Sequence, residues 1–291
     1  MARKPTTRPA GKPKPASIAG TLTKADIPQL AGGKGANKPQ MASPTYRLAA
    51  LDQEYLLSDS MRGVRFMLEY DKAEEALDRW GVRSTIVVFG SARFSEKGPP
   101  DHRRWYSEAR AFARIVSEKG GAKLQNGGQR DNVIATGGGP GIMEAANRGA
   151  HDVGAPSIGY NITLPMEQEP NAFSTPDLTL RFHYFAMRKM HFLIRSVALV
   201  CFPGGFGTLD ELFEVMTLQQ TGKIRRRPIL LFGRAFWERL IDFEHLVETG
   251  MIAPADRQLF HFVETAEQAW HLLAAEYGIG NGNGNGTATA D

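Results

Sequence analysis

Cysteine is almost missing from this sequence, because Cys201 is the only one among 291 residues. A single thiol cannot form an intrachain disulfide, and this usage is typical of a reducing compartment. No run of about 18 apolar residues is present for a membrane span, and the first residues lack the apolar stretch of a secretion signal. These absences predict a cytoplasmic protein that does not bind a membrane.

Motifs that bind metal ions or nucleoside triphosphates are missing as well. The seven histidines show no H-E-x-x-H or comparable ligand spacing, and there is no cysteine cluster. No glycine-rich loop ends in the Lys-Ser/Thr pair of NTP-hydrolysing proteins. We therefore expect no metal and no cofactor.

Negative charge is scarce only at the N-terminus. Residues 1–47 hold nine lysines and arginines against the single acid Asp26, a net charge of +8, which leaves −4 for residues 48–291 out of the chain's total of +4. A body with a net negative charge offers no general field for a polyanion. The sequence therefore predicts no specific nucleic-acid partner.

The two ends differ in composition from the middle. Residues 1–47 are rich in Pro, Lys, Gly, Thr and Ala, so they can bury too little surface to offset chain entropy, and we expect a disordered basic tail. Residues 280–291 form a low-complexity Gly/Asn segment, typical of a flexible tail. Between them we expect one domain, 48–279, with a helical N-terminal extension over 49–80.

Short apolar runs alternate with helical patterns through the remaining chain. Strands are expected at 85–89, 133–135, 157–161, 197–202 and 229–232. Helices are expected near 103–119, 141–152, 184–195, 208–221, 235–249 and 265–277. This alternation predicts an α/β fold with a doubly wound, Rossmann-like parallel sheet, whose ligands bind beyond the carboxyl ends of the strands.

The ends of the first two predicted strands carry small residues. After residue 89, Gly90 and Ser91 would let a ligand approach the backbone, although a purely structural turn would look the same. After residue 135, Gly138, Gly139 and Gly141 lead into a helix whose start favours an anion. Glu144 stands where the dinucleotide fingerprint needs its third glycine, so NAD is not expected. Glu144 could bind substrate or simply complement the helix dipole.

The strongest signal follows the strand at 197–202. Gly204, Gly205 and Gly207 free the main chain to wrap an oxyanion, and Thr208 adds a hydroxyl. Glu211 lies about one turn into the following helix and can face the same pocket.

Two cations precede that strand. Arg188 could clamp a phosphate or the base, and Lys189 could do likewise. A surface Arg-Lys pair is the alternative, but three glycine-rich turns nearby favour a role in the site.

Residues 203–211, Pro-Gly-Gly-Phe-Gly-Thr-Leu-Asp-Glu, resemble the PGGxGTxxE signature of the Lonely Guy family, also labelled lysine decarboxylase-like. Residues 137–144 resemble its second glycine-rich motif, and the likeness spans about residues 83–270. The resemblance implies hydrolysis of the N-glycosidic bond of a nucleoside 5′-monophosphate, such as AMP or a cytokinin riboside 5′-monophosphate. It implies catalytic roles for Arg188 and Glu211, a phosphate cradle at 204–208, and a homodimer or higher homo-oligomer.

Two other functions stand beside this one. Lysine decarboxylation would need a Schiff-base lysine with a pyridinium partner for PLP, and no such constellation is present beyond Lys189. A non-catalytic nucleotide-sensing module would use the same glycines, but would not need Glu211 beside an anionic ligand. The sequence also departs from the family at Glu144, where the plant enzymes usually have glycine, and in its additional 49–80 segment.

Overall fold

The computed structural model describes residues 35–123, 128–164 and 169–277. Residues 1–34 of the predicted basic tail and the whole predicted Gly/Asn tail, 280–291, lie outside these ranges. The chain divides into two compact units, Met1–Met61 and Arg62–Asp291.

The described part of the first unit holds only short helical turns. They are α1 (Lys38–Ala42), η2 (Pro44–Tyr46), η3 (Ala49–Leu51), α2 (Gln53–Leu57) and η4 (Asp59–Met61). Helix α1 falls in the range predicted to be disordered, and it begins with a proline in its first turn, where the missing N–H costs nothing. No residue between 35 and 61 is buried. The two units divide at 61/62, because these short turns build no core.

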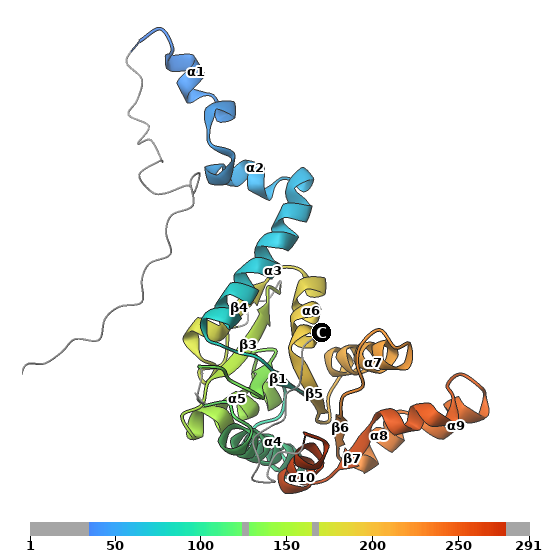
Figure 1. Ribbon diagram of the computed structural model, residues 1–291. Helices are drawn as coiled ribbons and strands as arrows, with labels where there is room; N and C mark the ends of the chain where they lie inside the picture. Colours follow the sequence, from blue (N-terminus) through green and yellow to red (C-terminus); the bar gives the residue numbers. More distant parts are fainter. Residues whose placement is uncertain (1–34, 124–127, 165–168, 278–291) are drawn as a thin grey trace, which may run out of the picture. The chain divides into compact units, whose positions relative to one another are not determined.

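A parallel sheet of seven strands forms the centre of the second unit (Figure 1). Its strands are β1 (Thr85–Phe89), β2 (Val133–Thr136), β3 (Ser157–Ile162), β4 (Thr179–Phe182), β5 (Ser196–Cys201), β6 (Ile229–Phe232) and β7 (His261–Val263). They lie in the order β4-β3-β2-β1-β5-β6-β7, and every pairing is parallel. The predicted α/β fold with a doubly wound parallel sheet is confirmed.

The five predicted strands are the buried ones, and the two that the sequence did not reveal, β4 and β7, are the edges. All residues of β1, β2 and β6 are buried. By contrast, β4 and β7 are short and partly exposed, so they lack the continuous apolar run that marks a central strand.

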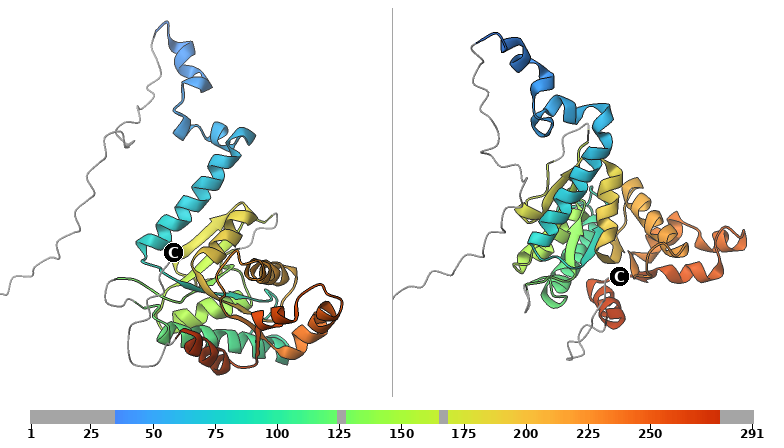
Figure 2. Two further views of the ribbon diagram at one scale, coloured as in Figure 1. Left: turned by 45° about the vertical axis from the view of Figure 1, so that its right-hand side comes forward. Right: turned by 45° about the horizontal axis from the view of Figure 1, so that its top comes forward.

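Helices cover both faces of the sheet. They are α3 (Arg62–Arg79), α4 (Pro100–Lys119), α5 (Ile142–Asp152), α6 (Phe185–Ile194), α7 (Phe206–Gln220), α8 (Arg234–Leu240), α9 (Phe243–Glu248) and α10 (Ala266–Tyr277). Helices α4, α5 and α10 pack together on one face, and α3 packs on α6 on the other, as Figure 1 and the two views of Figure 2 agree. Among the described residues, no helix is long and apolar enough to cross a membrane.

The single helix predicted over 235–249 is instead two, α8 and α9. The chain becomes extended at Ile241, and the Asp242 side chain then accepts a hydrogen bond from the backbone N–H of His245 at 2.9 Å. A side-chain cap of this kind starts a new helix, which the apolar pattern alone did not reveal.

Strand order locates the site. Strands β1 to β4 are added in one direction, and the chain then returns to place β5 on the other side of β1. In open α/β sheets, ligands bind outside the carboxyl ends of the strands where the order reverses. The ends of β1 and β5 are therefore the place to examine.

Candidate functional site

Three turns meet beyond the carboxyl ends of β1, β2 and β5. The N–H of Ser91, after β1, donates to the carbonyl of Pro203, after β5, at 3.0 Å. The N–H of Ile142, after β2, donates to the carbonyl of Ser91 at 3.1 Å. The three glycine-rich segments found in the sequence thus form one cluster at the switch point.

Two of the glycines allow the turns to approach each other. A Cβ at Gly90 would lie 2.7 Å from the Ile142 side chain. Gly141 has φ +73°, and a Cβ there would lie 2.3 Å from the carbonyl oxygen of Ser91. Gly90 and Gly141 therefore let the turns after β1 and β2 pack closely, Gly90 against the Ile142 side chain and Gly141 against the Ser91 backbone.

The turn after β2 is held by hydrogen bonds to Thr136 and from Asn171. The Gly138 N–H donates to the Thr136 hydroxyl at 3.0 Å, so this donor is not available to an anion without rearrangement. The backbone N–H of Asn171 donates to the Gly138 carbonyl at 2.8 Å, and its side-chain amide donates to the Gly139 carbonyl at 3.1 Å. Asn171 was not singled out from the sequence, since nothing in a single loop asparagine marks the distant turn that it braces.

The turn after β5 opens directly into α7. Gly205 is the N-cap residue, and no side chain caps the helix there. The first N–H groups of a helix have no partner within the helix and carry its positive dipole end. Gly204 lies against the buried Thr208, because a Cβ at Gly204 would meet the Thr208 hydroxyl at 2.2 Å. This helix start is suited to binding an anion.

One carboxylate and one guanidinium face each other below this helix start. Glu211 is only 3% exposed, and its Oε1 lies 3.8 Å from Nη2 of Arg188 on α6. Within the described part of the chain, neither Glu211 Oε1 nor Arg188 Nε has a hydrogen-bond partner. The neighbouring Asp210 is exposed instead. Helix α7 therefore turns Glu211 inward and Asp210 outward.

Burial controls the charge of this pair. It raises the pKa of Glu211 to about 7, although Arg188 and Lys189 both oppose the change. Burial also lowers the pKa of Arg188, against the attraction of Glu211. A carboxyl group with a pKa near neutrality can both give and take a proton at physiological pH.

Replacing Glu211 by glutamine should stabilise the protein at alkaline pH. The folded-state pKa lies above the ordinary value, so the ionised carboxylate destabilises the fold above pH 7, and this cost is relieved as pH falls from about 7 to 4.5. We expect a gain of about 3 kcal/mol near pH 8.5 and almost none near pH 4.5. Denaturant unfolding of both proteins at the two pH values measures it. An equal difference at both would show that Glu211 is not a buried ionised group.

Lys189 points to the outer side of the same helix pair. Its Nζ lies 2.9 Å from Asp210 Oδ1 and 3.1 Å from Glu214 Oε2. The structure thus places this predicted substrate-binding cation in ion pairs that join α6 to α7. These pairs flank the Arg188–Glu211 contact.

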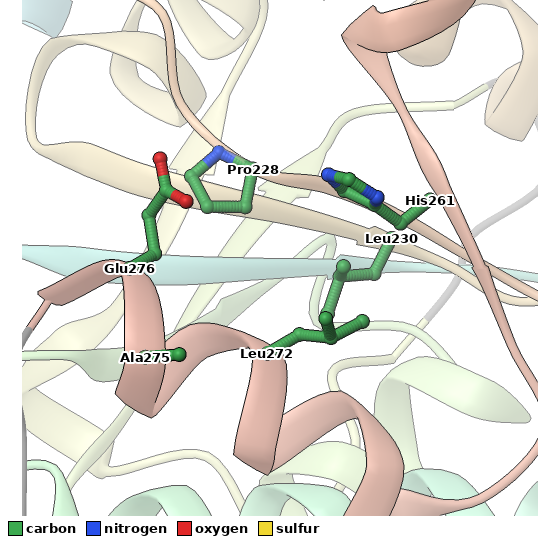
Figure 3. A pocket seen from close by; sticks show the side chains of 6 residues that line it. All are labelled: Pro228, Leu230, His261, Leu272, Ala275 and Glu276. Atoms are coloured by element: carbon green, nitrogen blue, oxygen red, sulfur yellow. The ribbon is translucent and has the colours of Figure 1, made fainter.

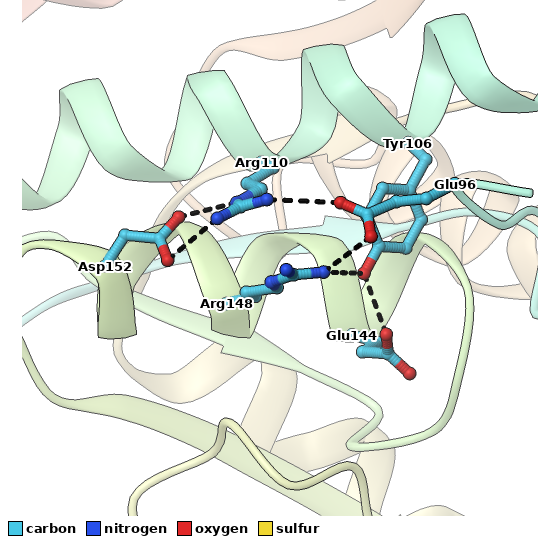
Figure 4. Close-up of polar contacts among 6 residues, drawn as sticks. All are labelled: Glu96, Tyr106, Arg110, Glu144, Arg148 and Asp152. Carbon is cyan, nitrogen blue, oxygen red and sulfur yellow. Dashed lines mark hydrogen bonds and ion pairs between the residues drawn. The ribbon is translucent and has the colours of Figure 1, made fainter.

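Glu144 belongs to a polar network between α4 and α5, shown in Figure 4. The Tyr106 hydroxyl donates to Glu144 Oε1 at 2.7 Å, and burial raises the pKa of Tyr106 to about 12, so the hydroxyl keeps its proton. Arg148 reaches both the Tyr106 oxygen, at 3.5 Å, and Glu96, at 2.9 Å. Glu144 is therefore fixed in place by a tyrosine far away in the sequence.

The pocket shown in Figure 3 lies elsewhere. It is lined by Pro228, Leu230, His261, Leu272, Ala275 and Glu276. Pro228 precedes β6 and His261 begins β7, so this pocket is at the amino ends of the strands, away from the glycine turns. Within the described ranges, no three His, Cys, Asp or Glu side chains gather as a metal site would require.

Comparison with known proteins matches residues 143–273 to the family model described as "Possible lysine decarboxylase". The chain is 32% identical over 139 residues to the probable cytokinin riboside 5′-monophosphate phosphoribohydrolase LOG6 of Arabidopsis thaliana, covering 47% of this chain and 68% of that protein. It is 30% identical over 141 residues to cytokinin riboside 5′-monophosphate phosphoribohydrolase LOG3 of the same plant, covering 47% and 64%. The match thus spans about two thirds of these relatives.

Among solved structures, the Moco carrier protein from Chlamydomonas reinhardtii aligns with a TM-score of 0.42 at 19% identity, covering 67% of this chain and 99% of that chain. The sequence relatives carry the assignment. The glycine-rich turns at 137–144 and 203–211 lie together beyond the carboxyl ends of the strands, and by its sequence relatives the chain belongs to the Lonely Guy family of lysine decarboxylase-like proteins.

Proposed function

We propose that this protein hydrolyses the N-glycosidic bond of a nucleoside 5′-monophosphate, giving the free base and ribose 5-phosphate. The observation that carries the proposal is the buried Glu211 beside Arg188, one turn below an uncapped helix start at the switch point of the sheet. The names of the plant relatives favour the same bond, since they are phosphoribohydrolases of cytokinin riboside 5′-monophosphates.

In this proposal the 5′-phosphate binds at the start of α7. The N–H groups of the turn from Gly204 to Gly207 would donate to the phosphate oxygens, and Thr208 would add its hydroxyl if it turns from its present buried position. Gly90, Ser91, Gly139 and Gly141 would form the facing wall, because their turns already contact one another. The phosphate would thus hold the ribose over the crevice.

Glu211 and Arg188 would act at the glycosidic bond. Cleavage passes through a ribosyl cation with oxocarbenium character, which a nearby carboxylate stabilises. With a pKa of about 7, Glu211 can also accept a proton from the attacking water as the C–N bond breaks. Arg188 would assist departure of the base or hold the phosphate, and Lys189 would keep α6 and α7 together near the substrate.

Glu144 is proposed to face the sugar side of the same crevice, held there by Tyr106. The homo-oligomer implied by the family resemblance belongs to the same proposal. The proposed cleavage of the N-glycosidic bond depends neither on the role of Glu144 nor on the number of subunits.

AMP should be hydrolysed and adenosine barely so. The helix start supplies binding energy only to a phosphorylated substrate, so we expect kcat/KM to differ by at least about 10²-fold. The full chain is incubated with AMP, an N6-prenylated AMP, the other nucleoside monophosphates and adenosine, and released base is measured by chromatography.

Ribose 5-phosphate must appear in equal amount with the base, since phosphate release would indicate a phosphatase instead. Equal turnover of AMP and adenosine would remove the phosphate cradle from the proposal. No release of base from any nucleotide would contradict the proposed function.

A further inference from the structure

Helix α3 lies outside the segment that matches the family model, yet it packs along α6, the helix that carries Arg188 (Figure 1). It contacts the beginning of α6 through one carboxylate. Glu69 Oε1 accepts the backbone N–H of His183 at 2.8 Å, and Oε2 accepts that of Tyr184, the N-cap residue of α6, at 3.2 Å. Glu69 thus satisfies two backbone donors at the start of this helix.

The same loop is held by side chains of the first half of α3. Arg65 Nε donates to the Tyr184 hydroxyl at 2.9 Å, and the Phe66 ring meets the Tyr184 ring edge-on with centroids 4.3 Å apart. The start of α6 is therefore attached to α3 by polar and apolar contacts together.

A second carboxylate of α3 holds the other end of α6. Glu74 Oε1 lies 3.3 Å from His191 Nδ1, and Glu74 Oε2 lies 2.5 Å from Nη2 of Arg195, the C-cap residue of α6. Arg195 also contacts Asp78 at 2.7 Å and donates to the carbonyl of Val82. Both ends of α6 are thus bound to α3 by glutamates five positions apart.

The His191 side chain that contacts Glu74 is buried in a group of aromatic rings. It is 1% exposed and lies among the rings of Tyr70, Phe182 and Tyr160, at centroid distances of 5.4, 5.3 and 6.1 Å. Within the described residues, the charged groups that act on its imidazole are Glu74 and Arg195. Loss of the Glu74 charge would remove the carboxylate that faces both this imidazole and the Arg195 guanidinium, and so weaken the attachment of this end of α6 to α3.

Arg188 lies between these two attachment points, four residues after Tyr184 and three before His191. Its guanidinium carbon lies 5.1 Å from the Phe185 ring centre and 5.6 Å from that of Phe192, both on the same helix. The side chain therefore moves with α6, and any rotation or slide of the helix changes the Arg188–Glu211 distance.

We propose that α3 is a positioning element of the active site, in which Glu69 and Glu74 hold α6 so that Arg188 faces Glu211. Neither glutamate touches the reacting atoms. The effect of this positioning on catalysis rests on the proposed function, whereas the attachment of α6 to α3 does not.

The test compares Glu74→Gln with Glu75→Gln in the full chain. Glu75 is the adjacent residue of α3, is exposed, and pairs with Arg79 of the same helix at 3.0 Å, so it is a matched control. Loss of the Glu74 charge should lower kcat for AMP by about 10-fold or more at nearly unchanged KM, because misplacement of a catalytic group by about 1 Å is costly. Glu75→Gln should match the wild type.

Hydrogen–deuterium exchange of the α6 amides gives a readout that needs no activity. We expect exchange of residues 185–194 to become at least about 10-fold faster in Glu74→Gln and to stay unchanged in Glu75→Gln. Glu69→Gln, which removes the carboxylate that accepts the His183 and Tyr184 N–H groups, serves as the second variant if Glu74→Gln fails to fold, with the same expected changes.

Unchanged α6 exchange in a folded Glu74→Gln protein overturns the attachment. Faster exchange with kcat and KM both unchanged overturns the positioning role. If the wild type releases no base from any nucleotide, the proposed function fails, and the exchange comparison still decides whether α3 holds α6.

Discussion

Glu211→Gln should lower kcat for AMP by at least about 10²-fold, the range typical of a lost acid–base or electrostatic group. Glutamine keeps the shape of the side chain and the 3%-exposed packing beneath the helix start, but it has neither a charge nor a proton to exchange. Affinity for AMP should stay the same or tighten, because a carboxylate near the phosphate repels it in the ground state. Single-turnover cleavage and calorimetric binding measure the two effects separately.

Asp210→Asn is the matched comparison, because Asp210 is the next acid along the same helix and is exposed. Its ion pair with Lys189 is shared with Glu214, so a loss of only a few-fold is expected. Near wild-type turnover in Glu211→Gln together with an inactive Asp210→Asn would show that Asp210, and not Glu211, carries the chemistry.

Gly141→Ala should destabilise the fold by about 3 kcal/mol, which is the sum of a left-handed backbone strain and an overpacked contact. Gly141 has φ +73°, and the added methyl would meet the Ser91 carbonyl oxygen at 2.3 Å and backbone atoms of Ala92 at 2.7 Å. Because both neighbours are backbone, they cannot rotate away, and the turns after β1 and β2 must separate. Thermal melting should shift down by about 10 °C, and AMP cleavage should fall with it.

Gly63→Ala on α3 is the control for this substitution. A Cβ at Gly63 meets nothing within 4 Å, and its φ is not positive. The melting temperature should stay unchanged or rise slightly, since alanine favours a helix by up to about 1 kcal/mol over glycine. A Gly141→Ala protein as stable as the wild type would show that the turns are not in the close contact described above.

The local pattern of the sequence was enough to predict the central strands and the residues that follow them. Strands β1, β2, β3, β5 and β6 are buried on both faces, so each appears as an apolar run. Helix α7 buries Glu211 and leaves Asp210 exposed, because neighbouring helix positions differ by about 100°, and the catalytic role of Glu211 stays a prediction. The break between α8 and α9 and the two edge strands escaped prediction, because a side-chain cap and short, half-exposed strands leave little periodic signal.

Only the tertiary structure decided which distant residues support the site. The order of the strands placed β5 beside β1 and so brought residues 90–91, 138–141 and 204–208 together. Tyr106 on Glu144 and Asn171 on the turn after β2 are contacts across 38 and 32 or more positions of sequence. The pKa of Glu211 and the attachment of α6 by Glu69 and Glu74 likewise arise from burial and from side chains of separate helices. Local sequence carries the periodicity of one element, whereas these properties depend on how elements pack against one another.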